Sequence, residues 1–412
     1  MDAPRRPRTL TMADRDPPAH GDIDMDAVRQ YRLARVRRGL AERDIAAAVL
    51  MDPLNIRYAT DSTNMQVWVM HNPARYAFVP AEGPVVLFDF HNCEFLSDGL
   101  GTVDEVRPAI STNYFLAGPR FGERAARWAA ELADLVRAHG GGNRRLGLDC
   151  ASPLCAFALD REGIEVVDAG QVLEHARALK SPGEVACMRA SIAAADEGMR
   201  RMREALTPGI TENALWSLLH QANIEMGGEW IETRLLASGS KTNPWFQECG
   251  FRVIRDGDLV SFDTDLIGPF GYCADISRTF LCGDGHASDE QRRLYATARE
   301  QIETNLTRLR PGIGLHEFGQ VAYDLAPEFR RNRYSVVAHG VGLCDEYPHV
   351  PYPEDYGHGG YDGVIVPGMT LCVESYVGAE GGAEGVKLEQ QVLMTDSGPE
   401  LLSHFPFEDK LA

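Results

Sequence analysis

Apolar residues in the first part of the chain alternate between helical and extended spacing. From Asp24 to about Arg43 they fall on one helical stripe, and Phe121 to Ala138 repeats that spacing. Shorter apolar runs predict strands at residues 45–51, 76–79, 85–90, 145–148 and 164–167. Because strands alternate with helices, we expect an α/β domain over residues 24–178.

A second domain is expected from residue 179 to residue 412. Ser181 as N-cap, Pro182 at the first helical position and Glu184 as its partner form a capping box, which predicts a long helix from Pro182 to about Ala205. Further helices are expected from Glu212 and at 289–309 and 315–326, and strands at 259–267, 270–280, 369–377 and 385–394. The whole chain is therefore predicted to have an α+β fold.

Composition and charge narrow the classes of partner. The chain has 412 residues, enough for two domains with sizeable cores, and a net charge of -19. This charge argues against a nucleic acid or an anionic membrane as the main partner. We find no apolar run of about 18 residues for a membrane span, and no signal peptide.

Two further features concern the compartment and the N-terminus. The nine cysteines include no CxxC pair, which is typical of free thiols in a reducing compartment, so we expect a cytoplasmic protein. Residues 1–23 are rich in Pro, Arg and Asp, and they are expected to form a disordered tail because they offer too little apolar surface to bury.

Three carboxylates in an apolar hairpin are the first candidate site. Asp263 and Asp265 lie two residues apart in one predicted strand, so their side chains should share a face, and the returning strand brings back Asp275. Like charges buried together need a cation, and three oxygen donors suit a divalent ion. The alternative is an acidic hairpin that is simply solvated.

Three other ionisable residues interrupt apolar strands in the second half: His339, Glu374 and Glu389. A buried Glu is rare without a partner, whereas His339 taken alone is more often a core histidine than a ligand. Five carboxylates and one imidazole would suffice for two bridged metal ions. An oxygen-rich set without thiolates favours iron, manganese, cobalt or zinc over copper.

Six motifs in the second half resemble the pita-bread metallopeptidase and creatinase superfamily, which includes prolidase, aminopeptidase P and methionine aminopeptidase. They are KSPGEV, GDLVSFDTD, GYCADISRTF, HGVG, PGMTLCVE and VKLEQQVLMT, in the order of that superfamily. The resemblance implies a creatinase-like α/β domain followed by a C-terminal pita-bread domain. It also implies two divalent or transition metal ions, held by Asp263, Asp275, His339, Glu374 and Glu389.

The sequence departs from the peptidase pattern at three places. Asp263 and Asp275 are separated by one residue more than in the peptidases, and Asp265 stands where a glycine is usual, which suggests a sixth metal ligand. Trp245 lies near the place of one peptidase histidine, and Asp345 occupies the place of another. Both imidazoles that assist peptide hydrolysis are therefore missing.

The departures and the N-terminal motif RYATDSTNMQVW together closely resemble the DddP-type dimethylsulfoniopropionate lyases. This resemblance implies elimination of dimethyl sulfide from a small-molecule substrate, dimethylsulfoniopropionate, leaving acrylate. It also implies a homodimer, with iron as the favoured metal and zinc, manganese or cobalt as alternatives. Trp68 and Tyr334 look like the substrate-binding aromatic residues of that family, although core packing would equally explain both side chains.

We interpret Asp345 as the general base, because it stands beside the HGVG segment and is not needed to complete the metal set. Burial among Leu343, Cys344 and Tyr347 is expected to raise its pKa. The alternative is that Asp345 only forms a hydrogen bond to a neighbouring loop or ligand.

Two other functions remain open on the sequence. An Xaa-Pro dipeptidase or creatinase-like metallohydrolase would use the same fold, although the missing histidines argue against it. A non-enzymatic pita-bread binding protein would need no metal, and the complete set of ligand positions argues against that function.

Overall fold

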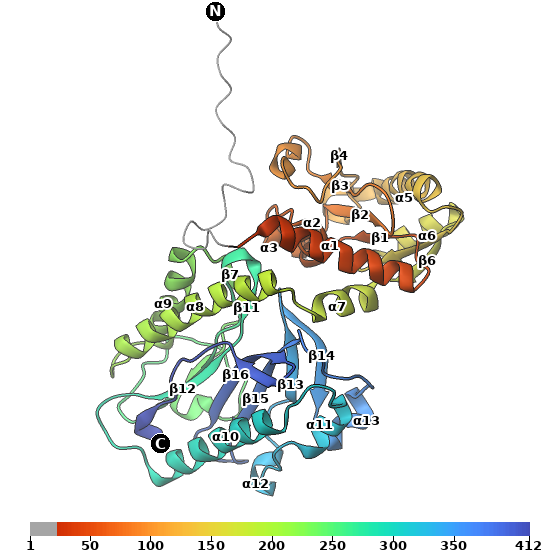
Figure 1. The fold of residues 1–412 in the computed structure, drawn as a ribbon. Coiled ribbons are helices and arrows are strands. Elements are labelled where there is room, and N and C mark those ends of the chain that lie inside the picture. Colours follow the sequence, from red (N-terminus) through yellow and green to blue (C-terminus); the bar gives the residue numbers. More distant parts are fainter. Residues whose placement is uncertain (1–22) are drawn as a thin grey trace, which may run out of the picture. The chain divides into compact units, whose positions relative to one another are not determined.

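The computed structural model describes residues 23–412, which form two compact units, residues 24–177 and residues 178–412 (Figure 1). Apart from residue 23, the predicted disordered tail lies outside the described residues.

The first unit is built around one six-stranded sheet with the strand order β4-β3-β2-β1-β5-β6. Its strands are β1 (Ala47–Leu50), β2 (Tyr76–Pro80), β3 (Val86–Asp89), β4 (Glu105–Pro108), β5 (Arg145–Leu148) and β6 (Glu165–Asp168). Its helices are α1 (Met25–Glu42), α2 (Pro53–Thr60), α3 (Gln66–His71), α4 (Tyr114–Ala117), α5 (Phe121–His139), α6 (Pro153–Arg161) and α7 (Gly170–Ala178). Strand β1 pairs antiparallel with β2 and parallel with β5, so the sheet is mixed.

A fully buried ion pair fixes the segment between α2 and α3. Arg75 Nε and Nη2 donate to the two carboxylate oxygens of Asp89 at 2.9 and 2.8 Å, and neither side chain is exposed. Arg75 Nη2 also donates to Ser62 Oγ, and Asn64 donates to Asp89. The charges of Arg75 and Asp89 compensate each other, so the pair is stable in the core. Its hydrogen bonds to Ser62 and Asn64 fix the position of residues 62–64, which precede the helix that carries Trp68.

The second unit contains three sheets, with strand orders β11-β10-β7, β12-β9-β8 and β14-β13-β15-β16-β17. The strands are β7 (Trp230–Ile231), β8 (Leu236–Ser238), β9 (Leu259–Asp263), β10 (Leu266–Ile267), β11 (Cys273–Ala274), β12 (Ser277–Leu281), β13 (Val336–Val341), β14 (Asp345–Pro351), β15 (Thr370–Val377), β16 (Val386–Thr395) and β17 (Gly398–Leu401). The helices are α8 (Pro182–Ala205), α9 (Glu212–Glu225), α10 (Asp289–Arg308), α11 (Leu315–Val321), α12 (Pro327–Arg330) and α13 (Tyr356–Gly359).

The predicted capping box opens α8. The Glu184 amide donates to Ser181 Oγ, and the Ser181 amide donates to the Glu184 carboxylate, so two of the otherwise unpaired donors at the helix start are satisfied. The helix spans the predicted residues Pro182 to Ala205.

The sheets of the second unit lie between α8 and α9 on one side and α10 on the other (Figure 1). Two hydrophobic cores result, one where α8 and α9 cover β9 and β12, and one where α10 and α11 cover the five-stranded sheet. The buried Arg278 of β12 joins the sheets, since its Nη1 donates to the Glu389 carbonyl of β16 at 2.8 Å.

The acidic hairpin is less regular than predicted. The expected strand 259–267 is wrong because it breaks after Asp263, and Asp265 adopts a left-handed φ of 37°. Thr264 stabilises the break, since its hydroxyl donates to the Ala274 carbonyl and accepts from the Ile276 amide. The returning strand breaks too, at Asp275, so these carboxylates lie at irregular points of the sheet and do not share one pleat.

The predicted helix 315–326 is also too long, because α11 ends at Val321. The chain then leaves helical geometry at Ala322, and the Tyr323 amide donates to the side chain of Asn305 on α10.

Replacing Arg75 by Met should lower the free energy of unfolding by about 3–5 kcal/mol, because Asp89 would be left as a buried, uncompensated charge. Urea denaturation measures this loss. Arg120→Met is the control, since Arg120 pairs with Glu123 at the surface, and we expect little change. Equal stability of the Arg75 variant and the wild-type protein would contradict the structural role of the pair.

Candidate metal centre

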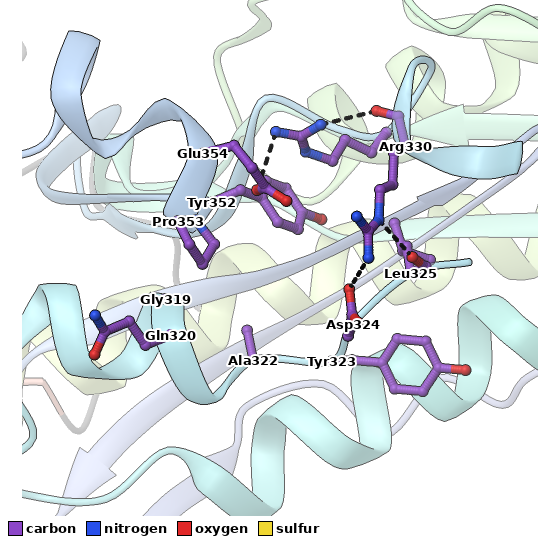
Figure 2. Close-up of a pocket in the computed structure, with 11 residues that line it drawn as sticks. Gly319, Gln320, Ala322, Tyr323, Asp324, Leu325, Arg330, Tyr352, Pro353 and Glu354 are labelled. Atoms are coloured by element: carbon purple, nitrogen blue, oxygen red, sulfur yellow. Dashed lines mark hydrogen bonds and ion pairs between the residues drawn. The ribbon is translucent and has the colours of Figure 1, made fainter. Parts of the chain in front are cut away.

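A cavity of about 220 Å³ lies in the second unit but contains none of the predicted ligands (Figure 2). Its cationic side chains are already paired, Arg330 with Asp324 and Arg333 with Asp355. The predicted metal ligands therefore lie elsewhere in this unit.

The strands of the second unit bring all six predicted ligands together. Glu374 of β15 and Glu389 of β16 lie directly opposite each other in the antiparallel ladder, and His339 comes from the neighbouring strand β13. Asp263 ends β9, and Asp275 lies between β11 and β12. One carboxylate oxygen from each of Asp263, Asp265 and Asp275 lies within 4.8 Å of the other two.

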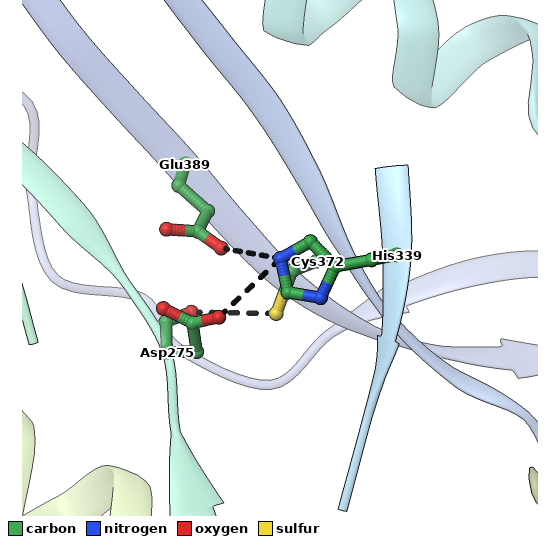
Figure 3. A group of neighbouring side chains, drawn as sticks. All are labelled: Asp275, His339, Cys372 and Glu389. Atoms are coloured by element: carbon green, nitrogen blue, oxygen red, sulfur yellow. Dashed lines mark hydrogen bonds and ion pairs between the residues drawn. The ribbon is translucent and has the colours of Figure 1, made fainter. Parts of the chain in front are cut away.

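His339 points into this cluster (Figure 3). Its Nε2 lies 3.3 Å from Glu374, 3.5 Å from Asp275 and 3.8 Å from Glu389. Burial by itself would lower the pKa of His339, but the hydrogen bond to Glu374 and the surrounding carboxylates raise that pKa to about 10. His339 Nδ1 lies 3.1 Å from the Gly340 carbonyl, a contact that would leave Nε2 free to bind a cation.

Three buried carboxylate oxygens in the cluster have no hydrogen-bond partner among the described residues: Asp263 Oδ1, Asp275 Oδ1 and Glu389 Oε1. Buried acceptors of this kind are costly unless a cation compensates them. The donors are oxygen atoms with one imidazole nitrogen, a set that fits divalent transition metal ions. The residues therefore fit a metal centre.

Lys387 supplies one positive charge in the same place. Its buried Nζ lies 2.7 Å from Glu374, 3.1 Å from Asp263 and 3.2 Å from Glu389. With His339 neutral, as a metal ligand must be, five ionised carboxylates and one ammonium leave four negative charges, which two divalent ions would balance.

The electrostatics differ from one carboxylate to the next. Burial, followed by the charges of Glu389 and Asp263, raises the pKa of Asp275 well above its ordinary value. Burial and the charges of Asp263 and Glu374 likewise raise the pKa of Glu389. Burial opposes ionisation of Asp263 as well, but Lys387 makes the net change a lowered pKa. Without a further cation, protons would bind to the carboxylates whose pKa is raised.

Asp265 stands at the edge of the cluster. It is half-buried, and its carboxylate accepts a hydrogen bond from the Thr233 hydroxyl. Burial and the charge of Asp263 raise its pKa well above the ordinary value. Its left-handed backbone turns the side chain toward Asp263 and Asp275, although the three residues do not share one strand.

Asp345 lies beside the cluster, at the start of β14. Its Oδ1 is 3.6 Å from His339 Nδ1. Desolvation raises the pKa of Asp345, His339 opposes the rise, and Asp263 adds to it. The expected burial is wrong: Leu343 is buried, but 67% of the Asp345 side chain is exposed. A small molecule can therefore reach this carboxylate.

The predicted aromatic residues lie in different units. In the first unit, Trp68 is 36% exposed and its ring is 5.8 Å from that of Phe90. In the second unit, the ring of Tyr334 lies 4.5 Å from Lys387 Nζ. Tyr334 therefore contacts the carboxylate cluster through the ammonium of Lys387. Trp245 is buried, and its ring centroid lies 6.0 Å from the same amine.

Sequence reasoning missed two residues of the cluster. Lys387 could have been found, because a lysine two residues before Glu389 in an apolar strand must share its face and its burial. Cys372 is buried in strand β15 like a small core residue, but its sulfur lies within 4.8 Å of ligand atoms of Asp275, His339 and Glu389 (Figure 3). Its thiol donates to the Asp275 carbonyl.

The chain matches two known protein families along its length. Metallopeptidase family M24 matches residues 186–396, about half of the chain, and the creatinase/prolidase N-terminal domain matches residues 32–179. The chain belongs to metallopeptidase family M24. This membership includes the region that holds the carboxylate cluster, and enzymes of the family use divalent metal ions at a dinuclear site.

Two curated relatives of this M24 chain are named dimethylsulfoniopropionate lyase DddP. The protein from Roseovarius nubinhibens is 43% identical over 393 residues, which cover 94% of this chain and 88% of the relative. The protein from Roseobacter denitrificans is 42% identical, again over 94% of this chain and 88% of the relative. An Xaa-Pro dipeptidase from Lactobacillus helveticus is 28% identical, over 90% of this chain and 96% of its own.

Solved structures confirm the predicted fold class, an α+β protein with a creatinase-like domain before a pita-bread domain. The Xaa-Pro dipeptidase from Bacillus anthracis has a TM-score of 0.74 at 20% identity, covering 92% of this chain and 99% of that chain. Dipeptidase PepE from Mycobacterium ulcerans has a TM-score of 0.72 at 23% identity, with 93% and 97% covered. Within residues 23–412, no helix has both the length and the apolar character that crossing a membrane requires.

Removing metal from the wild-type protein with a chelator should lower its thermal unfolding midpoint. A hundredfold excess of free metal over its dissociation constant contributes about 2.7 kcal/mol of stability. Glu389→Gln should reduce the metal content, as measured by elemental analysis, and should make the midpoint insensitive to the chelator. Asp345→Asn is the control and should retain metal; a fully active protein that contains no metal would contradict the assignment.

Proposed function

We propose that this protein is a dimethylsulfoniopropionate lyase, which forms dimethyl sulfide and acrylate by β-elimination. The observation that carries the proposal is the 43% identity, over 94% of the chain, to a relative named for this activity. The geometry of the centre agrees with it, because the reaction needs a base, a cationic site for a carboxylate and no general acid.

Asp263, Asp265, Asp275, His339, Glu374 and Glu389 would hold two metal ions, and we propose iron as the metal, with zinc, manganese or cobalt as alternatives. Bound metal would supply positive charge that holds the substrate carboxylate and favours loss of a proton from the adjacent carbon. The three unpartnered carboxylate oxygens support this role, since they are buried and a cation would compensate them.

Asp345 would take the proton from the carbon next to the substrate carboxylate. The released electron pair forms the carbon–carbon double bond of acrylate, and the carbon–sulfur bond breaks with its electrons going to sulfur. Dimethyl sulfide leaves as a neutral molecule, so no side chain needs to protonate it. The exposure of Asp345 and its raised pKa both support its role as a base.

Trp68 and Tyr334 would bind the sulfonium end of the substrate through their ring faces. The ammonium of Lys387 at 4.5 Å from the Tyr334 ring supports this role only by position, because it places the ring beside the carboxylate cluster. Trp68 is exposed enough to contact a ligand.

Peptide hydrolysis by this chain is disfavoured at two positions. Trp245 and Asp345 stand near the places where a peptidase would carry histidines, and neither supplies an imidazole. We therefore give precedence to the lyase over the Xaa-Pro dipeptidase, although the dipeptidase relatives share the fold.

We also propose that the protein is a cytoplasmic homodimer. No disulfide joins the nine cysteines, all of which lie in the described part of the chain, and this fits a reducing compartment. The dimer is expected from the family; sedimentation would test it.

The purified, metal-loaded protein should release dimethyl sulfide from dimethylsulfoniopropionate, measured in the headspace. Asp345→Asn should reduce this release at least about a hundredfold, because it keeps the shape of the side chain but removes its basicity. Metal content and substrate binding should stay at the wild-type level. Substantial turnover by this variant would refute the assignment of the base, whereas release of proline from an Xaa-Pro dipeptide in place of dimethyl sulfide would refute the lyase.

A further inference from the structure

Phe246 combines an unusual backbone with an exposed ring. Its φ is 69°, in the left-handed region that a residue with a bulky side chain rarely adopts, and 57% of the residue is exposed. Both features are unfavourable for folding, because the backbone is strained and an apolar ring remains in water. Strain that folding does not require is often retained at a functional site.

The segment that carries Phe246 is tied to the segment that carries Tyr334. The Asn243 amide group donates to the carbonyls of Ala379 and Gly382 at 2.8 and 2.9 Å. Asn332 in turn donates to the Asn243 side-chain oxygen at 3.0 Å. These bonds hold the residues just before both aromatic rings, so the position of Phe246 relative to Tyr334 is set by the fold.

The two rings stack at the edge of the metal centre. The centroids of Phe246 and Tyr334 are 5.4 Å apart, with an angle of 30° between the ring planes. Tyr334 has the ammonium of Lys387 at 4.5 Å, and that ammonium contacts Glu374 at 2.7 Å. Phe246 is therefore separated from the carboxylate cluster by one aromatic ring and one cation.

We propose that Phe246 is a specificity-determining residue that, with Tyr334, forms a two-ring surface for the dimethylsulfonium group. This inference rests on the proposed function, because it takes the substrate to be a carboxylate with an alkylated cation at its other end. A phenyl ring attracts such a cation through its negative face, yet it offers no hydrogen bond or charge to a hydrated ammonium. It would therefore favour a sulfonium over a neutral group of equal size.

The full-length, metal-loaded protein allows a direct test with four variants. Phe246→Ala removes the ring, Phe246→Leu keeps apolar area without the ring face, and Phe246→Tyr restores the ring. Phe251→Ala is the matched control, since Phe251 lies five residues further along and is 86% exposed. The measurements are KM, kcat and calorimetric binding of two unreactive carboxylates, one with a trimethylammonium end and one with a neutral tert-butyl end.

We expect Phe246→Ala and Phe246→Leu to raise KM roughly two- to thirtyfold, with kcat changed much less, because a cation–π contact of this size is lost. Binding of the trimethylammonium probe should weaken by a similar factor. In Phe246→Leu the neutral probe should bind as in the wild-type protein. Phe246→Tyr and Phe251→Ala should behave as the wild-type protein does.

A fifth variant separates function from folding. Phe246→Gly relieves the left-handed backbone, so its thermal unfolding midpoint should be no lower than that of Phe246→Ala, while its KM stays raised. A glycine variant that binds the cationic probe normally would overturn the proposal.

Other outcomes are equally decisive. If Phe246→Leu binds both probes as the wild-type protein does, the ring face has no role and the inference fails while the lyase assignment stands. If Phe246→Ala sediments as a smaller species with an unchanged KM, the ring belongs to an interface and the inference fails. If the wild-type protein releases no dimethyl sulfide but binds the cationic probe in a manner that depends on Phe246, the proposed function fails and the inference stands.

Discussion

The need to neutralise a group of buried carboxylates governs the second unit of this protein. Asp263, Asp275, Glu374 and Glu389 are each at most 2% exposed, and hydrogen bonds from the described residues leave an oxygen on three of them without a partner. Lys387 offsets only part of their charge. Because uncompensated buried charge would destabilise the fold, the structure is consistent only with additional cations or protons at the centre.

Rigid strands make this concentration of charge tolerable. Glu374 and Glu389 face each other in a continuous antiparallel ladder, where their separation is set by the hydrogen-bonded backbone. Arg278 ties the neighbouring sheet to the same strand through the Glu389 carbonyl. The carboxylates cannot move apart without breaking these bonds. Binding a cation therefore relieves their repulsion at a lower cost in free energy.

Under the proposed function, the surroundings of the centre would suit elimination better than hydrolysis. An exposed carboxylate, Asp345, stands near His339, and aromatic side chains lie beside the ammonium of Lys387. These groups suit a substrate with an acidic carbon–hydrogen bond and a cationic leaving group, because one can take a proton and the others can hold a cation without forming a bond to it. A peptide would need proton donors that Trp245 and Asp345 do not provide in imidazole form.

The sequence by itself predicted six residues that the structure brings together in the second unit, and most of the elements that carry them. Charged residues in apolar strands can be recognised because burial without compensation is so costly, and the Ser181–Glu184 capping box marks its helix by local spacing alone. The tertiary structure decided the rest. The break at Asp265, the burial of Lys387 in the cluster and the stacking of Phe246 on Tyr334 depend on contacts between segments far apart in sequence. Such contacts follow from strand register and loop conformation, which the local pattern of residues does not specify.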